Sequence, residues 1–349
     1  MTAETEEAVA AAWATLAPLM DLVTPMALRV AATLRLADFM PDAGAGEGAD
    51  LGELAERAGA DPNALARVLR HLVEHGVFSE PRPGRFAANR AAALLRTGQP
   101  AAQWLDLDGF GGRMDLAFTG LMHTVRTGEP AWEAVFGRPF WDWLDANPAI
   151  SASFDAVMAV DGGNSAVAGG FDWSTVRRVA DIGGGTGTLI AEVLRRNPHL
   201  RGTLAELPAT AARAREYLAG LGLDARCEVV GQSFFDPLPA GADVYLLSRV
   251  LHDWDDAAAG AILRRCAEAA GSAGRVLVIE SAAVDGDLAG FAEMNLRMLV
   301  LAGGRERTVD DYAALAASAG LRVTTIHHFT ERHVILECVT SATQVAGTR

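Results

Sequence analysis

The sequence contains no lysine, and all 30 of its basic residues are arginine. A chain without lysine cannot form a Schiff base with a carbonyl substrate or use a lysine as a base. The 44 acidic residues outnumber the basic ones, which leaves a formal net charge of −14. This charge disfavours nucleic acid and anionic membranes as partners, because both are themselves negatively charged.

Cysteine is scarce, with three residues far apart in the sequence (Cys227, Cys266 and Cys338). They form no C-x-x-C pair, so neither a disulfide framework nor a zinc site is expected. No uninterrupted apolar run reaches the ~18 residues typical of a membrane span, and the acidic N-terminus lacks the basic region of a secretory signal. We therefore expect a cytoplasmic protein without a membrane partner.

The most informative stretch is a glycine-rich turn within VADIGGGTGT, residues 179–188. An apolar run precedes the turn and an amphipathic helix follows it, which is how an α/β sheet holds a nucleotide-like ligand. The dinucleotide pattern G-x-G-x-x-G fails, because Thr188 stands where the third glycine is required. The pattern is D-x-G-x-G-x-G instead, in which Asp181 precedes Gly183 and Gly185.

Two carboxylates near this turn indicate which ligand it binds. Asp181 is a poor neighbour for a pyrophosphate and a good partner for an ammonium group. Glu206 closes the next apolar run, about 20 residues further on, where a carboxylate can bind ribose hydroxyls. An ammonium, a ribose and no phosphate together favour S-adenosylmethionine; the alternative is a glycine turn that binds no ligand.

Apolar runs alternate with helical stretches from residue 176 onward. This alternation predicts an α/β fold with a Rossmann-like, doubly wound, mostly parallel sheet. Only a few residues separate the last two runs, so we expect them to form a terminal antiparallel hairpin. The runs are 176–182, 201–207, 226–230, 242–248, 274–280, 321–327 and 333–339.

The N-terminal region is expected to be mainly helical. Residues 6–40 carry more apolar surface than a free helix needs, so the rest of the chain or a second copy must cover them. After a polar loop at 41–50, residues 51–90 show helix, turn, helix and two short strands, typical of a winged helix. Such a unit can bind DNA, but the acidic balance and the lack of a basic cluster favour a packing role.

A tryptophan-, methionine- and phenylalanine-rich segment follows at 101–170. Such side chains line pockets for flat ligands, so this segment is expected to be a helical linker and substrate cap. We therefore divide the chain into a dimerisation and winged-helix-like domain (1–100), this linker (101–170) and a cofactor-binding domain (171–349).

The candidate base is His252, which follows the apolar run 242–248 and should therefore lie at the carboxyl edge of the sheet. A neutral imidazole there can accept the proton of a bound hydroxyl, and a carboxylate on its other nitrogen would fix its tautomer. Glu280 and Glu306 lie at comparable edge positions. The alternative is that His252 merely enters a helix capped by Asp255 or Asp256.

A metal site is the other interpretation of the acidic stretch around His252. Its members are consecutive in one turn and cannot all face one point, so no metal is expected.

Six stretches then carry a resemblance. The chain resembles, over nearly its whole length, the small-molecule O-methyltransferases of the caffeate and isoflavone type, and especially the actinobacterial branch acting on polyketide antibiotics. The stretches are WLDLDGFGGR (104–113), HTVRTGEPAWEAVFGRPFWDWL (123–144), DIGGGTGTL (181–189), FFDPLP (234–239), LLSRVLHDWDD (246–256) and MLVLAGGRERT (298–308).

The resemblance implies methyl transfer from S-adenosylmethionine, which leaves S-adenosylhomocysteine, to a hydroxyl of a small aromatic acceptor by a homodimer. It implies His252 as general base, flanked by Glu280 and Glu306. Together with the residues of the glycine-rich turn, it implies a set of cofactor-side residues: Asp181, Gly183, Gly185, Glu206, Ser233, Phe234 and Ser248. Residues implied on the acceptor side are Met158, Asp253, Arg297 and Met298.

Some positions depart from the family pattern. Ser233 stands where an aspartate usually holds the adenine amino group, which would weaken that contact or transfer it to Gln232. Ser248 stands where plant members carry lysine, and Trp143 replaces an acid. Relatives with this fold also decarboxylate, hydroxylate or close rings, and a winged-helix regulator that senses S-adenosylmethionine is the non-enzyme alternative. The retained His252 and both acids favour methylation.

Overall fold

The computed structural model describes residues 3–159, 164–283, 291–328 and 333–341. The chain folds as two compact units, Met1–Arg113 and Met114–Arg349. The boundary between the units falls within the predicted middle segment, 101–170, whose role as a linker and cap stays a prediction.

In the first unit, helices pack on a small antiparallel sheet. Helix α4 (Pro62–Glu74) begins as predicted: the Asp61 carboxylate accepts a hydrogen bond from the Ala64 amide at 2.8 Å, and Pro62 occupies the first turn. The predicted wing strands are present, and a third strand pairs beside them in order β1-β3-β2. The other elements are α1 (Ala3–Met20), α2 (Val23–Thr33), η1 (Leu36–Phe39), β1 (Ala49–Asp50), α3 (Leu51–Ala58), β2 (Phe78–Arg82), β3 (Arg85–Ala88), α5 (Arg90–Ala93) and α6 (Pro100–Leu105).

Helix α1 leaves its apolar side chains uncovered by the described part of the chain. Every residue from 7 to 20 is exposed, including Trp13 at 57% and Leu19 at 78%. One helical stretch in the described residues, Glu7–Thr33, is long and apolar enough to cross a membrane by length and composition alone. The stretch is not an uninterrupted apolar run, because Asp21 lies between the two helices that form it, and the absence of a membrane partner stays a prediction.

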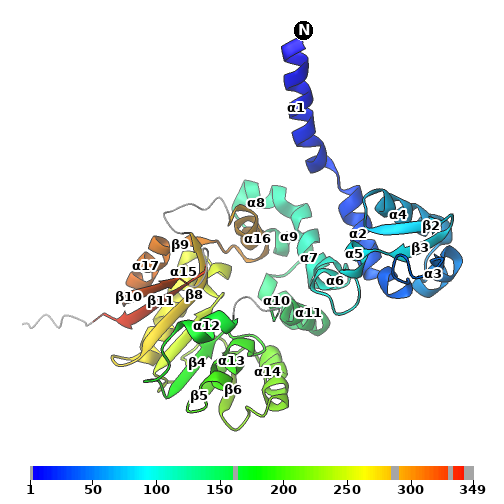
Figure 1. Cartoon of the computed structure of the whole chain (residues 1–349). Helices are drawn as coiled ribbons and strands as arrows, with labels where there is room; N and C mark the ends of the chain where they lie inside the picture. Colours follow the sequence, from blue (N-terminus) through cyan, green and yellow to red (C-terminus); the bar gives the residue numbers. More distant parts are fainter. Residues whose placement is uncertain (1–2, 160–163, 284–290, 329–332, 342–349) are drawn as a thin grey trace, which may run out of the picture. The chain divides into compact units, whose positions relative to one another are not determined.

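The second unit is built on one large sheet in the order β10-β11-β8-β7-β4-β5-β6, with β9 pairing beside β8 (Figure 1). The pairings from β8 to β6 are parallel, and β10 and β11 form the predicted antiparallel hairpin. The strands are β4 (Arg178–Ile182), β5 (Arg201–Glu206), β6 (Cys227–Gly231), β7 (Val244–Ser248), β8 (Arg275–Ala283), β9 (Arg307–Thr308), β10 (Leu321–His328) and β11 (His333–Thr340). All seven predicted strands are confirmed, and the short β9 was not predicted.

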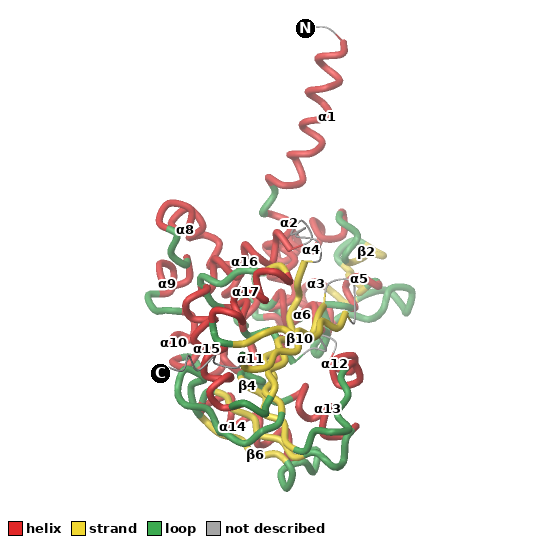
Figure 2. The backbone as a smooth tube through the Cα atoms, turned by 90° about the vertical axis from the view of Figure 1, so that its left-hand side faces the viewer, coloured by secondary structure: helices red, strands yellow, loops and turns green. Residues whose placement is uncertain are grey.

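Helices cover both faces of this sheet (Figure 2). Strand alternation sends neighbouring side chains to opposite faces. Ala180 and Ile182 pack towards α15 and α17, whereas Val179 packs towards α13. The helices and turns of the unit are α7 (Phe110–Ala117, which spans the boundary), η2 (Phe118–Gly120), α8 (Leu121–Thr127), α9 (Ala131–Phe136), α10 (Phe140–Ala146), α11 (Pro148–Met158), α12 (Asn164–Gly170), α13 (Thr188–Arg196), α14 (Pro208–Gly220), η3 (Leu251–Asp253), α15 (Asp256–Ala270), α16 (Ala292–Ala302) and α17 (Val309–Ser318).

The strand order reverses at β4. The chain moves from β4 to β5 and β6 on one side, then returns to place β7 on the other side of β4. In open α/β sheets, ligands bind outside the carboxyl ends of the strands at this switch point. The glycine turn follows β4 and His252 follows β7, so the two predicted halves of the site meet here.

Candidate active site

The segment that carries His252 leaves β7 through a sharp bend. Arg249 adopts a left-handed backbone (φ 54°), which is uncommon for a residue with a side chain. The Glu280 carboxylate, on the neighbouring strand β8, accepts hydrogen bonds from the amides of Val250 (3.1 Å) and Leu251 (2.9 Å). Glu280 therefore fixes the backbone immediately before His252, rather than bonding to the ring.

Glu306 bonds to the imidazole itself. Nδ1 of His252 lies 3.0 Å from Oε1 of Glu306, and the Glu306 side chain is only 1% exposed. Nε2, on the other edge of the ring, lies 3.5 Å from Oδ1 of Asp253. The predicted meeting of His252 and Glu306 is present, although 54 positions separate them in the chain.

These carboxylates determine the protonation of the imidazole. Burial alone would lower the pKa of His252, but the charges of Asp253, Glu280 and Glu306 outweigh it and raise the pKa to about 10. Burial also raises the pKa of Glu280 to about 7 and that of Asp253 to about 6. These charges favour the protonated imidazole, so His252 must lose a proton before it can act as a base.

The loop 303–308 lies directly against the His252 segment. The Arg305 amide donates to the His252 carbonyl at 2.8 Å, and the Glu306 amide donates to Oδ1 of Asn295 on α16 at 3.1 Å. A Cβ on Gly304 would lie 2.2 Å from the His252 carbonyl oxygen, so only glycine allows this approach. The loop ends in β9, which pairs with β8 and so carries Glu306 to the sheet edge.

The glycine turn after β4 has the backbone that its residues predict. Gly183 (φ 68°) and Gly185 (φ 58°) are left-handed, which glycine adopts without strain. Oε2 of Glu206 accepts a hydrogen bond from the Gly185 amide at 3.1 Å, so the predicted ribose acid lies at the turn. A Cβ on Gly183 would lie 3.3 Å from the Phe234 ring, so Phe234 also borders the turn.

Asp181 is placed differently from its predicted role. Its side chain is fully buried below the turn, and a Cβ on Gly184 would lie 2.4 Å from its carboxylate. Burial, together with the nearby Glu206 charge, raises its pKa to about 7. This position favours support of the turn from below over direct contact with an ammonium group, which stays a prediction.

The loop after β6 contains the predicted adenine-side residues. Oγ of Ser233 accepts a hydrogen bond from the Phe235 amide at 3.2 Å. The Gln232 side-chain amide donates to the Pro237 carbonyl at 3.1 Å, so it is already engaged within the loop. Ser248 is the last residue of β7, next to the bend.

Aromatic side chains extend from this loop to the predicted cap. Phe234 and Phe235 pack edge-on against Trp254, and Trp254 stacks on Trp141 of α10 with ring centroids 5.9 Å apart and an interplanar angle of 14°. Trp254 lies two residues after His252, so the tryptophan-rich segment borders the site. Flat rings of this kind suit a flat aromatic ligand.

The predicted acceptor-side residues differ in accessibility. Met158, at the end of α11, is 38% exposed, whereas Met298 on α16 is buried at 8%. Arg297 pairs with Glu293 (2.7 Å) and Asp115 (3.7 Å). Of these four residues, Asp253 lies beside His252, with Oδ1 3.5 Å from Nε2. The acceptor roles of all four stay predictions.

The residues at the switch point fit S-adenosylmethionine. The left-handed glycines admit a ligand close to the backbone, and Glu206 supplies a carboxylate at the adjacent strand end. Within residues 3–159, 164–283, 291–328 and 333–341, no group of three His, Cys, Asp or Glu side chains is arranged to hold a metal ion.

Two family models match the sequence. Residues 118–322 match the O-methyltransferase domain, and residues 18–98 match the O-methyltransferase dimerisation domain. The winged-helix-like unit lies within the second match, so the regulator hypothesis loses its support.

Individual relatives cover most of the chain. The 2,7-dihydroxy-5-methyl-1-naphthoate 7-O-methyltransferase of Streptomyces carzinostaticus is 46% identical over 313 residues, which span 88% of this chain and 92% of that protein. Aclacinomycin 10-hydroxylase RdmB of Streptomyces purpurascens is 49% identical over 313 residues, spanning 86% and 82%.

A solved structure is also similar. The O-methyltransferase NcsB1 of neocarzinostatin biosynthesis, in complex with S-adenosylmethionine and 2-hydroxy-5-methyl naphthoic acid, superposes with a TM-score of 0.84 at 44% identity. The match covers 93% of this chain and 98% of that one. The chain therefore belongs to the S-adenosylmethionine-dependent O-methyltransferase family, with its dimerisation domain and its methyltransferase domain both present.

Proposed function

We propose that this enzyme methylates a phenolic hydroxyl of a small aromatic metabolite, with His252 as the general base. The contact between His252 and Glu306, beside the glycine turn, is the observation that carries the proposal. When bound, S-adenosylmethionine supplies an electrophilic methyl group. The chain itself must hold the acceptor hydroxyl in place and accept its proton.

Nε2 of His252 is the atom that accepts this proton. Glu306 occupies Nδ1, which keeps the Nδ1 hydrogen in place and leaves the Nε2 lone pair as the acceptor. After transfer, the imidazolium is stabilised by the same carboxylate. Glu280 holds the backbone before His252, so the ring keeps its direction during the reaction.

The acceptor is proposed to be a bicyclic or larger aromatic phenol. Two observations support this. Trp141 of α10 stacks on Trp254 after His252, and Phe154 of α11 packs on Trp141. The similar naphthoate methyltransferase and NcsB1 act on or bind naphthoic acids. The test is incubation with methyl-labelled S-adenosylmethionine and a panel of phenols. Label in an ether product is expected; label in none of the hydroxynaphthoates would contradict the proposal.

Hydroxylation, with dioxygen and a two-electron reductant as co-reactants, is a second candidate, because a hydroxylase is among the similar relatives at 49% identity. The two reactions give different products from one phenol, heavier by one CH₂ group or by one oxygen atom. Mass spectrometry of the same reactions separates them. Retention of the His252–Glu306 pair favours the methylated product.

The cofactor site should bind S-adenosylhomocysteine and not NAD. We expect micromolar or tighter binding of S-adenosylhomocysteine by calorimetry, because the turn has the D-x-G-x-G-x-G pattern and a carboxylate at Gly185. Glu206→Gln should weaken this binding, whereas Glu337→Gln, a carboxylate in the hairpin paired with Arg275, should not. Heat with NAD and none with S-adenosylhomocysteine would contradict the assignment.

We also propose a homodimer in which a second copy covers α1. Its exposed apolar residues, together with the dimerisation match at 18–98, support this partner over a membrane. Light scattering should give twice the chain mass of 36.7 kDa, and Leu19→Glu should reduce it. Leu221→Glu, an exposed apolar position at the end of α14, is the control. A monomeric wild type at micromolar concentration would refute the proposal.

The buried, unpaired cysteines suit our proposal of a cytoplasmic enzyme.

A further inference from the structure

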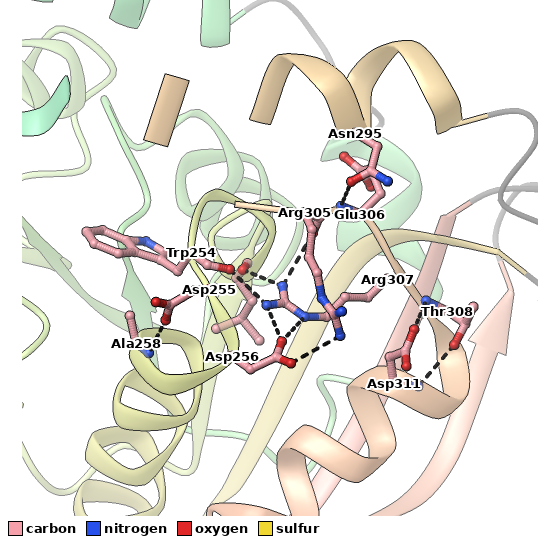
Figure 3. A network of polar contacts seen from close by, with 11 residues as sticks. Trp254, Asp255, Asp256, Ala258, Asn295, Arg305, Glu306, Arg307, Thr308 and Asp311 are labelled. Carbon is pink, nitrogen blue, oxygen red and sulfur yellow. Dashed lines mark hydrogen bonds and ion pairs between the residues drawn. The ribbon is translucent and has the colours of Figure 1, made fainter. Parts of the chain in front are cut away.

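Arg307 carries a charge that is completely enclosed in protein. Its side chain is 0% exposed, and its guanidinium donates to three groups of one segment (Figure 3). These are the Leu251 carbonyl at 2.8 Å, the Trp254 carbonyl at 2.8 Å and Oδ1 of Asp256 at 2.8 and 3.1 Å. A planar fork with several fixed donors can reach all three at once.

The three acceptors lie on both sides of His252 in the sequence. Leu251 precedes it, and Trp254 and Asp256 follow it, so the guanidinium spans the short turn η3 that presents the imidazole. Arg307 itself directly follows Glu306, the carboxylate that bonds to Nδ1. One side chain thus joins the backbone that carries the base to the backbone that carries its acid.

The positive charge of Arg307 is balanced locally. A buried guanidinium is costly unless an anion and hydrogen-bond acceptors compensate it. Asp256 supplies the anion and also pairs with Arg305 at 3.2 Å. Asp256 therefore pairs with arginines, whereas the carboxylate of its neighbour Asp255 caps α15 by accepting a hydrogen bond from the Ala258 amide. Of the two acids that the sequence offered as caps, only Asp255 has that role.

We propose that Arg307 is a positioning residue for methyl transfer, which holds the His252 segment and the Glu306 loop at the separation required for the imidazole–carboxylate hydrogen bond. The inference rests on the proposed role of His252 as base. It assigns to Arg307 a task that lysine cannot perform, because a single ammonium group does not match acceptors on both sides of a turn.

The test compares Arg307→Met and Arg307→Lys with Arg226→Met. Arg226 is a matched control: its guanidinium also gathers backbone carbonyls, those of Leu194 (3.1 Å) and Leu200 (3.3 Å), but at the opposite edge of the sheet. For each variant, kcat per folded enzyme, KM, S-adenosylhomocysteine affinity and the pH–rate profile are measured.

Both Arg307 variants should lower kcat about 10- to 100-fold, as a displaced catalytic group does, with S-adenosylhomocysteine affinity unchanged. The acid limb of their pH–rate profile should move to lower pH, because a loosened Glu306 no longer favours the charged imidazole. Arg226→Met should lose thermal stability alone. Arg307→Lys with wild-type kcat and pH profile would overturn the inference.

Two further variants keep the result interpretable. If Arg307→Met does not fold, Asp256→Asn replaces it in the test. This variant keeps an oxygen acceptor but removes the charge, so the acid limb of its pH–rate profile should also move to lower pH, by a smaller amount. An unchanged profile in Asp256→Asn and Arg307→Lys would overturn the positioning role. His252→Ala separates the two proposals: if it keeps full activity, the assigned base is wrong, whereas an inactive His252→Ala with normal Arg307 variants refutes only the positioning role.

Discussion

Replacing His252 by alanine is expected to lower kcat by roughly 10² to 10⁴, the usual contribution of a positioned general base. Affinity for S-adenosylhomocysteine should change little, because the glycine turn and Glu206 belong to other strand ends. Steady-state kinetics and calorimetry measure the two effects. Wild-type kcat at neutral pH, on an acceptor whose pKa exceeds about 9, would show that His252 is only a helix-entry residue.

The pH dependence of the rate tests the same assignment from its electrostatics. A base works only when deprotonated, and the surrounding carboxylates raise the pKa of His252 to about 10. The wild-type kcat/KM should therefore still rise above pH 7, instead of levelling near the usual histidine value of ~6.5. Removing one negative neighbour lowers the pKa of His252, so Glu306→Gln should move this limb to lower pH while kcat falls. Glu337→Gln should leave the limb unchanged, and an unmoved limb in Glu306→Gln would contradict the contact.

Gly304→Ala is expected to lower both the activity and the stability of the enzyme strongly. Its Cβ would lie 2.2 Å from the His252 carbonyl oxygen and 2.5 Å from the Asp253 carbonyl carbon. Both atoms are backbone and cannot rotate away, so the loop must shift, and kcat should fall by about 10²-fold. Overpacking of this kind costs about 1–3 kcal/mol, so the melting temperature should fall as well.

The matched control for this substitution is Gly220→Ala. Gly220 ends α14, and a Cβ there meets no atom within 4 Å. Its activity and melting temperature should remain those of the wild type. A Gly304→Ala enzyme that behaves like Gly220→Ala would show that the loop can move away from His252 without loss.

The sequence was sufficient for the sheet and for the two halves of the site. Alternating apolar runs predict strands because a strand buried on both faces must be apolar throughout, and all seven runs became strands. The glycine spacing predicted the left-handed turn, and the position of His252 after a strand predicted its place at the sheet edge.

Other features depend on three-dimensional contacts that no local pattern records. The complete burial of the Asp181 side chain is one such feature, while its predicted contact with an ammonium group stays a prediction. Nothing in the GGRERT stretch distinguishes Arg307 from other arginines, and its burial against Asp256 is visible only in the structure. The two-residue strand β9 is too short to produce any periodicity.

The His252–Glu306 contact places part of the candidate chemistry on a different segment from the predicted cofactor site. The residues predicted on the cofactor side lie between Asp181 and Ser248, whereas the carboxylate bonded to His252 comes from a loop 54 positions further along the chain. Substitutions in that loop can therefore abolish or redirect the chemistry while the cofactor is still bound. Because this loop lies outside the predicted cofactor segment, changes within it are compatible with a different type of reaction, in keeping with a similar relative that is named a hydroxylase.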